Sequence, residues 1–250
     1  AIEIKPNYAE AHFNLGLIWI NLDNLQQAEI SFLKAIELKP DFADPHIGLG
    51  RILLQRGEQD LSIKHFSQSA DLLRGQNNKE FNHTKFTTIS KAKIDHDIEQ
   101  FQYLVSHGYE THKFTYLTSL YKKIAAEINW PSETKLLYLN NKHQRLLKDS
   151  YNRLIHQIEA PRLNIDAINN CLKVKKITQD YFEHDFGLTY IDHFLNPIAL
   201  KSLREFLLGA TIWFDFKSGG YLGTYLKDGL ANPLIIQIAE ELRMKFPEIF

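Results

Sequence analysis

Eleven histidines are spread along this chain of 250 residues, and no other side chains in it could take part in as many kinds of chemistry. A His-x-Asp or His-x-Glu triplet on a strand would project two metal ligands from one face, but no histidine has an acid two residues further on. The triplet Asp95-His96-Asp97 lies in a helical pattern, where successive side chains point about 100° apart and cannot converge on one ion. The sequence therefore predicts a solvated helix face at this triplet, and no catalytic, cofactor-binding or metal-binding residue in the chain.

Three other groups of residues could suggest chemistry, and each has a simpler interpretation. The pairs His184-Asp185 and Asp192-His193 lie in turn-like sequence, where such residues usually make caps and local hydrogen bonds. The aromatic side chains of Trp213, Phe214 and Phe216 could line a ligand site, but aromatic residues in a strand pattern usually form core. We expect local hydrogen bonds from the first two groups and core packing from the third.

The composition excludes several classes of partner. Twenty-nine basic and thirty acidic residues leave no field that would attract nucleic acid or an anionic membrane. No apolar run approaches the roughly 20 residues that a membrane helix needs. The single cysteine, Cys171, cannot form an internal disulfide, and we expect a buried bystander thiol rather than a reactive one. These features fit a cytoplasmic, bacterial protein.

A repeat of 34 residues dominates the first third of the chain. Residues 9–40 align with residues 43–74, and the glycines Gly16 and Gly50 coincide. The pattern resembles the tetratricopeptide repeat, in which two antiparallel helices cross at a small residue. The run Ala1–Pro6 parallels Ala35–Pro40, so it reads as the tail of an earlier unit, and we expect the natural N-terminus to lie further upstream. The other matched positions pair His12 with His46, Leu15 with Leu49, Trp19 with Leu53, Ala28 with Ser62, Phe32 with Phe66, and Ala35 with Ser69.

The sequence divides into three predicted domains. Residues 1–74 form the repeats, with helices near 9–22, 25–38, 43–56 and 59–73, and a polar loop follows at 74–80. Residues 75–175 form a helical cap or linker, with helices from Ser90 and over 110–128, a further partly helical stretch over 146–158, and an extended connection. Residues 176–250 begin an α+β domain. In this third domain the pattern predicts helices over 176–184, 197–208 and 233–245, strands over 188–191, 211–216 and 221–226, and a turn at Gly219-Gly220.

A second resemblance covers about residues 90–250. The stretch Tyr190–Arg204, with Phe194-Leu-Asn-Pro197, resembles the start of prolyl-4-hydroxylase-like iron(II)/2-oxoglutarate oxygenases, and the run Ser202–Phe250 resembles bacterial proteins that join tetratricopeptide repeats to such a domain. The resemblance implies that residues 176–250 are the N-terminal part of a double-stranded β-helix. In the family the iron ligands lie beyond the helix that ends here near Lys245, so we expect this fragment to bind no cofactor.

Two functions from different classes follow from these resemblances. The first is a parent protein that uses Fe(II) and 2-oxoglutarate to hydroxylate a substrate, which the repeats recruit. The second is a non-catalytic scaffold for protein–protein interaction. A glycosyltransferase is a third possibility, although the sequence contains no nucleotide-binding turn to support it.

The repeats themselves predict a binding groove for a protein or peptide. In each unit, some side chains of the first helix point away from the partner helix and would line a concave face. With little more than two units this groove would be short, and the helices beyond the repeats could cover part of it. The predicted lining residues are Glu10, Phe13, Leu17, Asp44, Ile47 and Arg51.

Overall fold

The computed structural model describes residues 5–75, 84–217 and 219–250, and it is mainly helical with a few short strands. The chain divides into two compact units, one formed by residues 1–157 and 209–231 and the other by residues 158–208 and 232–250. The predicted domain limits at residues 74 and 175 stay a prediction.

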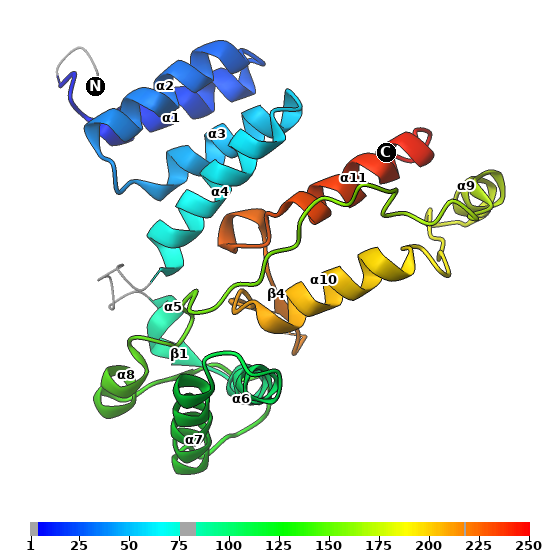
Figure 1. Ribbon diagram of the computed structural model, residues 1–250. Coiled ribbons are helices and arrows are strands. Elements are labelled where there is room, and N and C mark those ends of the chain that lie inside the picture. The colour runs from blue at the N-terminus through cyan, green and yellow to red at the C-terminus, as the bar shows by residue number, and fades with distance from the viewer. Residues whose placement is uncertain (1–4, 76–83, 218) are drawn as a thin grey trace. The chain divides into compact units, whose positions relative to one another are not determined.

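Two helical hairpins open the first unit. They consist of α1 (Ala9–Asn21) with α2 (Leu25–Leu38) and α3 (Ala43–Gln55) with α4 (Gln59–Arg74), so all four predicted helices are confirmed to within a residue or so. Figure 1 shows the two helices of each hairpin side by side. The turns inside the hairpins need a left-handed residue, which is Asp23 (φ 56°) in the first and Gly57 (φ 78°) in the second.

Small residues allow the helices of the repeats to approach closely. A Cβ atom added at Gly16 would lie 2.4 Å from the Phe32 ring, and one added at Gly50 would lie 3.0 Å from the Phe66 ring. The two predicted close-approach points therefore fit the geometry. A third glycine, Gly48, meets the other edge of the Phe32 ring at 2.5 Å. Phe32 thus packs against glycines of both hairpins, a contact that the 34-residue alignment did not reveal.

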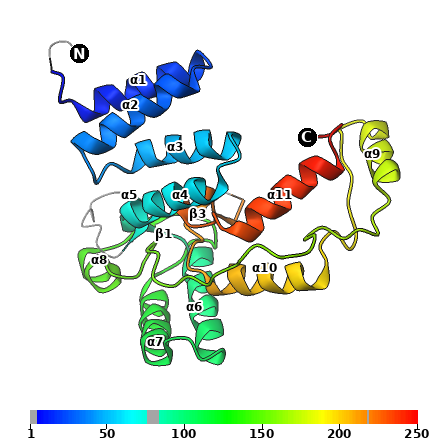
Figure 2. The ribbon, with the colours of Figure 1, turned by 45° about the horizontal axis from the view of Figure 1, so that its top comes forward.

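A second helical pair follows the repeats in the same unit. The helices α6 (Lys91–Ser106) and α7 (Thr111–Glu127) agree with the predicted helices from Ser90 and over 110–128, and Figure 2 shows them side by side. Ser90 caps α6, because its hydroxyl accepts a hydrogen bond from the Lys93 amide at 3.2 Å. Before them come α5 (Thr84–Thr87) and β1 (Thr88–Ile89), and β1 pairs antiparallel with β2 (Leu137–Tyr138).

The helix predicted within 146–158 is wrong in position. The observed helix α8 spans Asn141–Leu147, and Asn140 caps it by accepting a hydrogen bond from the His143 amide at 2.8 Å. Beyond it, Asn152 has a left-handed backbone (φ 54°), which interrupts helical geometry. The following amides bind distant acceptors instead, as Leu154 does at the Arg74 carbonyl. Long-range pairing therefore replaces the helix that local sequence suggested.

The segment 209–231 completes the first unit, and its strands are shorter than predicted. They are β3 (Asp215–Phe216) and β4 (Leu222–Gly223), which pair antiparallel and precede the 3-10 turn η1 (Leu226–Asp228). Thr211 does not start a strand, because its amide binds the His156 carbonyl at 2.9 Å and its hydroxyl accepts from the Ile155 amide at 2.9 Å. The predicted Gly219-Gly220 turn is present, with a left-handed Gly220 (φ 82°).

The second unit contains α9 (Val174–Glu183), α10 (Pro197–Gly209) and α11 (Pro233–Lys245), close to the three helices predicted there. Asparagine side chains cap two of them, since Asn196 accepts from the Ala199 amide and Asn232 accepts from the Ile235 amide. The strand predicted over 188–191 is wrong, because these residues are irregular and Tyr190 is 87% exposed. The beginning of a double-stranded β-helix in this part of the chain stays a prediction.

Buried carboxylate and amide groups of α11 hold the extended segment before α9. Glu241 accepts hydrogen bonds from the amides of Ala167 and Ile168 at 2.9 and 2.7 Å, and Gln237 donates to the Ile165 carbonyl at 2.9 Å. These bonds satisfy backbone groups that have no ladder partner, and so allow an irregular segment to pack against a helix.

Candidate functional site

The six predicted groove residues lie on the first helix of each hairpin. Of the three on α1, Glu10 forms an ion pair with Lys39 at 3.1 Å, and its pKa lies below the usual range because of a backbone hydrogen bond and this lysine. Phe13 packs against the rings of Phe32 and Phe42 at 5.8 and 5.2 Å, and Leu17 is exposed. The three α1 residues are therefore in different environments. Glu10 is held by an ion pair and Phe13 by ring contacts, whereas Leu17 is exposed to solvent.

The three α3 members are arranged differently. Asp44 is exposed near the start of the helix, while Ile47 and Arg51 line a hollow of about 520 Å³ that is open to solvent. Ile47 and Arg51 are one helical turn apart, so they project from the same face of α3. The structure thus brings two of the predicted residues together at a concave site. The other lining residues are Leu54, Phe66, Asp215, Tyr225, Leu226 and Lys227.

The far wall of this hollow comes from outside the repeats, from β3, η1 and the residue before η1. Figure 2 shows the segment that carries β3 passing beside α4, and η1 packs directly on α4. A buried ion pair joins the two, with Arg74 Nε 3.3 Å from Asp228 Oδ1 and side chains only 6% and 5% exposed. The Arg74 guanidinium also lies 4.5 Å from the centre of the Phe214 ring. Arg74 therefore fixes the position of the wall.

Charges on this wall are unevenly matched. Asp215 is bound by Lys217 at 2.5 Å, and Lys217 also donates to the Tyr225 hydroxyl at 3.0 Å. Although partial burial raises the pKa of Asp215, hydrogen bonds from Lys217 and Tyr225 hold it below the usual range. Arg51 and Lys227 form no ion pair with any other described residue. The rim of the hollow consequently carries an excess of positive charge.

Local sequence patterns gave no indication of this wall. The strand pattern over 221–226 placed Tyr225 and Leu226 in a strand, whereas they lie at the start of η1 and face α3 across the hollow. Nothing in the spacing of these residues relates them to a helix more than 150 positions earlier. Only the separation of Ile47 and Arg51 by one helical turn was readable from sequence.

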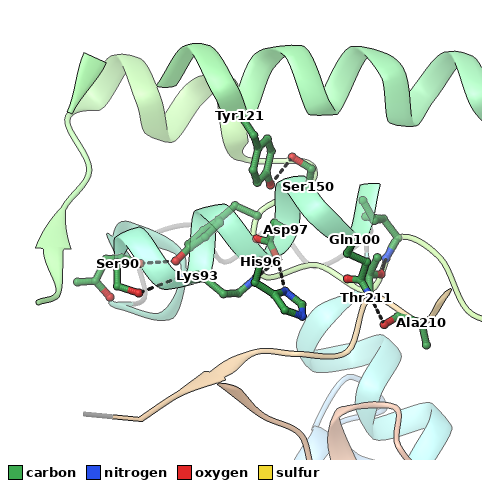
Figure 3. A network of polar contacts seen from close by, with 12 residues as sticks. Ser90, Lys93, His96, Asp97, Gln100, Tyr121, Ser150, Ala210 and Thr211 are labelled. Atoms are coloured by element: carbon green, nitrogen blue, oxygen red, sulfur yellow. Dashed lines mark hydrogen bonds and ion pairs between the residues drawn. The ribbon is translucent and has the colours of Figure 1, made fainter. Parts of the chain in front are cut away.

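The triplet Asp95-His96-Asp97 does not gather around an ion, but the predicted solvated face is wrong for part of it. Figure 3 shows Asp97 turned inward, where it pairs with Lys93, and the two residues are only 6% and 4% exposed. Asp95 pairs instead with Lys91 on the outer side at 2.5 Å. Burial lowers the pKa of Lys93, and Asp97 counteracts that effect. The pair therefore belongs to the core of the first unit.

Polar side chains surround this buried ion pair and link α6 to neighbouring segments. Tyr121 on α7 hydrogen-bonds the Ser150 hydroxyl at 3.0 Å, and Gln100 donates to the Ala210 carbonyl at 2.8 Å (Figure 3). His96 contacts the ring of Trp213 edge to face. Of the three aromatic residues predicted as core, only Phe214 is buried, whereas Trp213 and Phe216 are half-buried. This network fixes segment 209–231 to α6, which is a structural role.

The remaining sequence candidates have simple local roles. His184 Nδ1 accepts a hydrogen bond from the Phe186 amide at 3.2 Å, as predicted for a turn residue. Cys171 is exposed rather than buried, because it lies in an irregular segment outside the helices. Within residues 5–75, 84–217 and 219–250 no group of three histidine, cysteine or acidic side chains is placed to hold a metal ion. No described helix combines the length and apolarity needed to cross a membrane.

A pair of histidines, one buried (His46) and one half-buried (His65), lies between the helices of the second hairpin. His46 Nδ1 lies 2.9 Å from His65 Nδ1, so one imidazole donates and the other accepts. Burial, and secondarily the charge of His65, lower the pKa of His46 to about 4. Burial also lowers the pKa of His65, aided by Lys64 and opposed by Glu29. Both rings are therefore held neutral near pH 7.

This pair predicts acid sensitivity of the repeats. Because the folded-state pKa lies below the ordinary value of 6.5, the contribution to stability is complete above that pH and is lost as the pH falls toward 4. The loss attributable to His46 reaches about 3 kcal/mol, at 1.36 kcal/mol per pKa unit. Urea unfolding of the wild type and of His46→Gln at about pH 7.5 and about pH 4.5 measures it.

The matched control is His12→Gln, at the equivalent position of the first hairpin, where the ring hydrogen-bonds the Pro6 carbonyl and has no histidine partner like that of His46 among the described hydrogen bonds. We expect His46→Gln to flatten the pH dependence and His12→Gln to leave it unchanged. An equally steep loss of stability in His46→Gln would contradict the role of the pair.

Comparison with known proteins bears on the repeats. Residues 9–42 match the sequence model of the family described as Tetratricopeptide repeat. No curated protein matches the chain. The resemblance seen in the sequence is thus confirmed over the first hairpin and the loop that follows it.

Proposed function

We propose that this chain is a scaffold for protein–protein interaction that binds a peptide segment of its partner in the hollow beside α3. Tetratricopeptide repeats generally mediate such interactions, and residues 9–42 match that family. The observation that carries the proposal is the hollow of about 520 Å³, which contains Ile47 and Arg51 from the predicted groove.

The chemistry of the lining supports a peptide as the occupant. Ile47, Leu54, Phe66 and Leu226 supply apolar surface, while polar and charged groups stand at the rim. The volume of the hollow lies within the roughly 300–1,000 Å³ that is usual for ligand sites. Peptide grooves in helical repeats combine apolar anchor sites with charged edges in this way.

A peptide selection tests the proposal. We expect a random peptide library displayed on phage to yield sequences that bind the 250-residue chain, and we expect Ile47→Asp to abolish their binding because it places a carboxylate in the apolar floor. Binding is measured by fluorescence polarisation with the selected peptides.

The control variant is Ile30→Asp, which makes the same chemical change at an exposed isoleucine of α2 outside the hollow. It should bind like the wild type, and circular dichroism should show both variants folded. If selected peptides bind Ile47→Asp as tightly as the wild type, or if none is selected, the proposed site is wrong.

A second proposal concerns residues 176–250 and the oxygenase resemblance. Several large apolar side chains in this stretch are exposed, among them Phe182 at 60% and Phe186 at 89%. Exposed apolar surface of this kind is typical of a face that another layer of polypeptide covers. This supports, as a proposal, a parent protein in which residues 176–250 are the N-terminal part of a double-stranded β-helix. The rest of that domain would cover these side chains, hold Fe(II) and 2-oxoglutarate, and hydroxylate a recruited substrate.

The test of this second proposal is the sequence of the parent reading frame. A His-x-Asp triplet downstream, followed by a distal histidine and an arginine or lysine, would support it, and the extended protein should then bind Fe(II) and 2-oxoglutarate. If the reading frame contains no such triplet, the parent is not an oxygenase and the scaffold function stands alone.

A further inference from the structure

The rim of the hollow beside α3 carries two cations that no acidic group offsets in the described residues. Arg51 projects from α3 and Lys227 from η1, and both line the same cavity. The one acid of the lining, Asp215, is already bound by Lys217 and by the Tyr225 hydroxyl. An approaching partner therefore meets net positive charge from two sides.

We infer that the hollow selects an acidic peptide segment that carries a bulky apolar anchor residue. The inference rests on the proposed scaffold function and adds the chemical class of the partner. The anchor would lie against Ile47, Phe66 and Leu226, and flanking carboxylates would reach Arg51 on one side and Lys227 on the other.

The apolar floor determines the anchor. Phe66, in the middle of α4, is nearly fully buried, and Leu54 lies on α3 about one turn beyond Arg51 and two turns beyond Ile47. A large side chain placed here removes apolar surface from water on both partners, at about 25 cal/mol for each Å². A peptide without such a residue leaves the apolar side chains of the hollow exposed to water and gains little binding free energy from them.

The rim determines the charge. The guanidinium of Arg51 can bind a carboxylate through two parallel hydrogen bonds, and Lys227 supplies a second cation beside the exposed ring of Tyr225 at 6.0 Å. A basic segment would place like charges at both positions, which costs binding energy and slows association. A neutral segment would leave both cations without a partner.

The direct test uses three fluorescein-labelled peptides that share one leucine and tyrosine anchor and differ only in their flanks. The flanks contain glutamate, glutamine or lysine, and a fourth peptide keeps glutamate but replaces the anchor by alanine. We expect the glutamate peptide to bind the full chain about tenfold or more tighter than the glutamine peptide, with binding that weakens as salt is raised. The lysine and alanine-anchor peptides should show no saturable binding.

Variants of the chain identify the contacts. Arg51→Glu and Lys227→Glu should each weaken the glutamate peptide about tenfold and should improve binding of the lysine peptide. The control Lys123→Glu changes the net charge by the same amount at an exposed lysine of α7 that does not line the hollow. It should leave the affinity for the glutamate peptide unchanged and should not create binding of the lysine peptide.

Each outcome decides between the inference and the proposed function. If the three flanks bind equally well and Ile47→Asp still abolishes binding, the acidic preference is wrong but the scaffold function survives. If Lys123→Glu weakens binding as much as Arg51→Glu, the effect is one of net charge and the assigned contacts are wrong. If none of the four peptides binds, the inference is overturned, and a failed selection would overturn the proposed function as well.

Discussion

Replacement of Arg74 by methionine is expected to destabilise the first unit by about 3–5 kcal/mol and to abolish peptide binding at the hollow. The variant leaves Asp228 buried without its cation, since the Arg74 side chain lies between α4 and η1 and is 6% exposed. An uncompensated buried carboxylate disfavours the folded position of η1 far more than the loss of a surface pair would. Because η1 forms part of the hollow, stability and binding should decline together.

Urea unfolding of the full chain measures the first effect, and the fluorescein-labelled glutamate peptide measures the second. The matched control is Arg162→Met, which breaks an exposed ion pair with Glu240 at 3.0 Å and should cost no more than about 1 kcal/mol. The double variant Arg74→Met with Asp228→Leu should recover much of the lost stability, since apolar replacement of both partners removes the buried charge. A loss in Arg74→Met as small as that in Arg162→Met would show that this ion pair does not hold the wall.

Sequence reasoning succeeded where structure is decided by local periodicity. The four repeat helices, α6, α7 and the asparagine-capped helices α10 and α11 were all predicted close to their observed bounds. In each case an apolar stripe at helical spacing specifies the element without help from the rest of the chain, and a capping side chain adds to it in α2, α6, α10 and α11. The same reasoning placed Ile47 and Arg51 on one exposed face of α3.

Sequence reasoning failed where segments far apart in the chain supply each other's hydrogen-bonding partners. The residues after α8 and the residues from Thr211 bind each other through His156 and the Thr211 hydroxyl, so neither forms the helix or strand that its local pattern suggests. The wall of the hollow is attached by Arg74 and Asp228, which are 154 positions apart. The burial of Lys93 with Asp97 likewise depends on packing that no local pattern encodes. These features needed the structure because their energies come from long-range contacts.

Replacement of Phe32 by alanine is expected to cost about 3–5 kcal/mol in the free energy of unfolding of the repeats. The Phe32 ring is fully buried and packs against glycines on both sides, Gly16 of its own hairpin and Gly48 of the next. Removal of the ring leaves a cavity between two hairpins whose backbones are held apart by other contacts and cannot close fully. Urea unfolding, with hydrogen exchange of the α1 to α3 amides as the local probe, measures the loss.

Gly48→Ala separates packing from helix propensity at the same place. In an open helical position this change would stabilise by about 1 kcal/mol, but in the wild type the new Cβ would lie 2.5 Å from the Phe32 ring. We therefore expect Gly48→Ala to destabilise the wild type by about 1–3 kcal/mol, and to stabilise Phe32→Ala by partly filling its cavity. The sign of the Gly48→Ala effect should reverse between the two backgrounds. The new methyl group clashes with the Phe32 ring when the ring is present and fills part of its space when the ring is absent. If Gly48→Ala has the same effect in both backgrounds, Phe32 does not link the two hairpins and the repeats pack through other contacts.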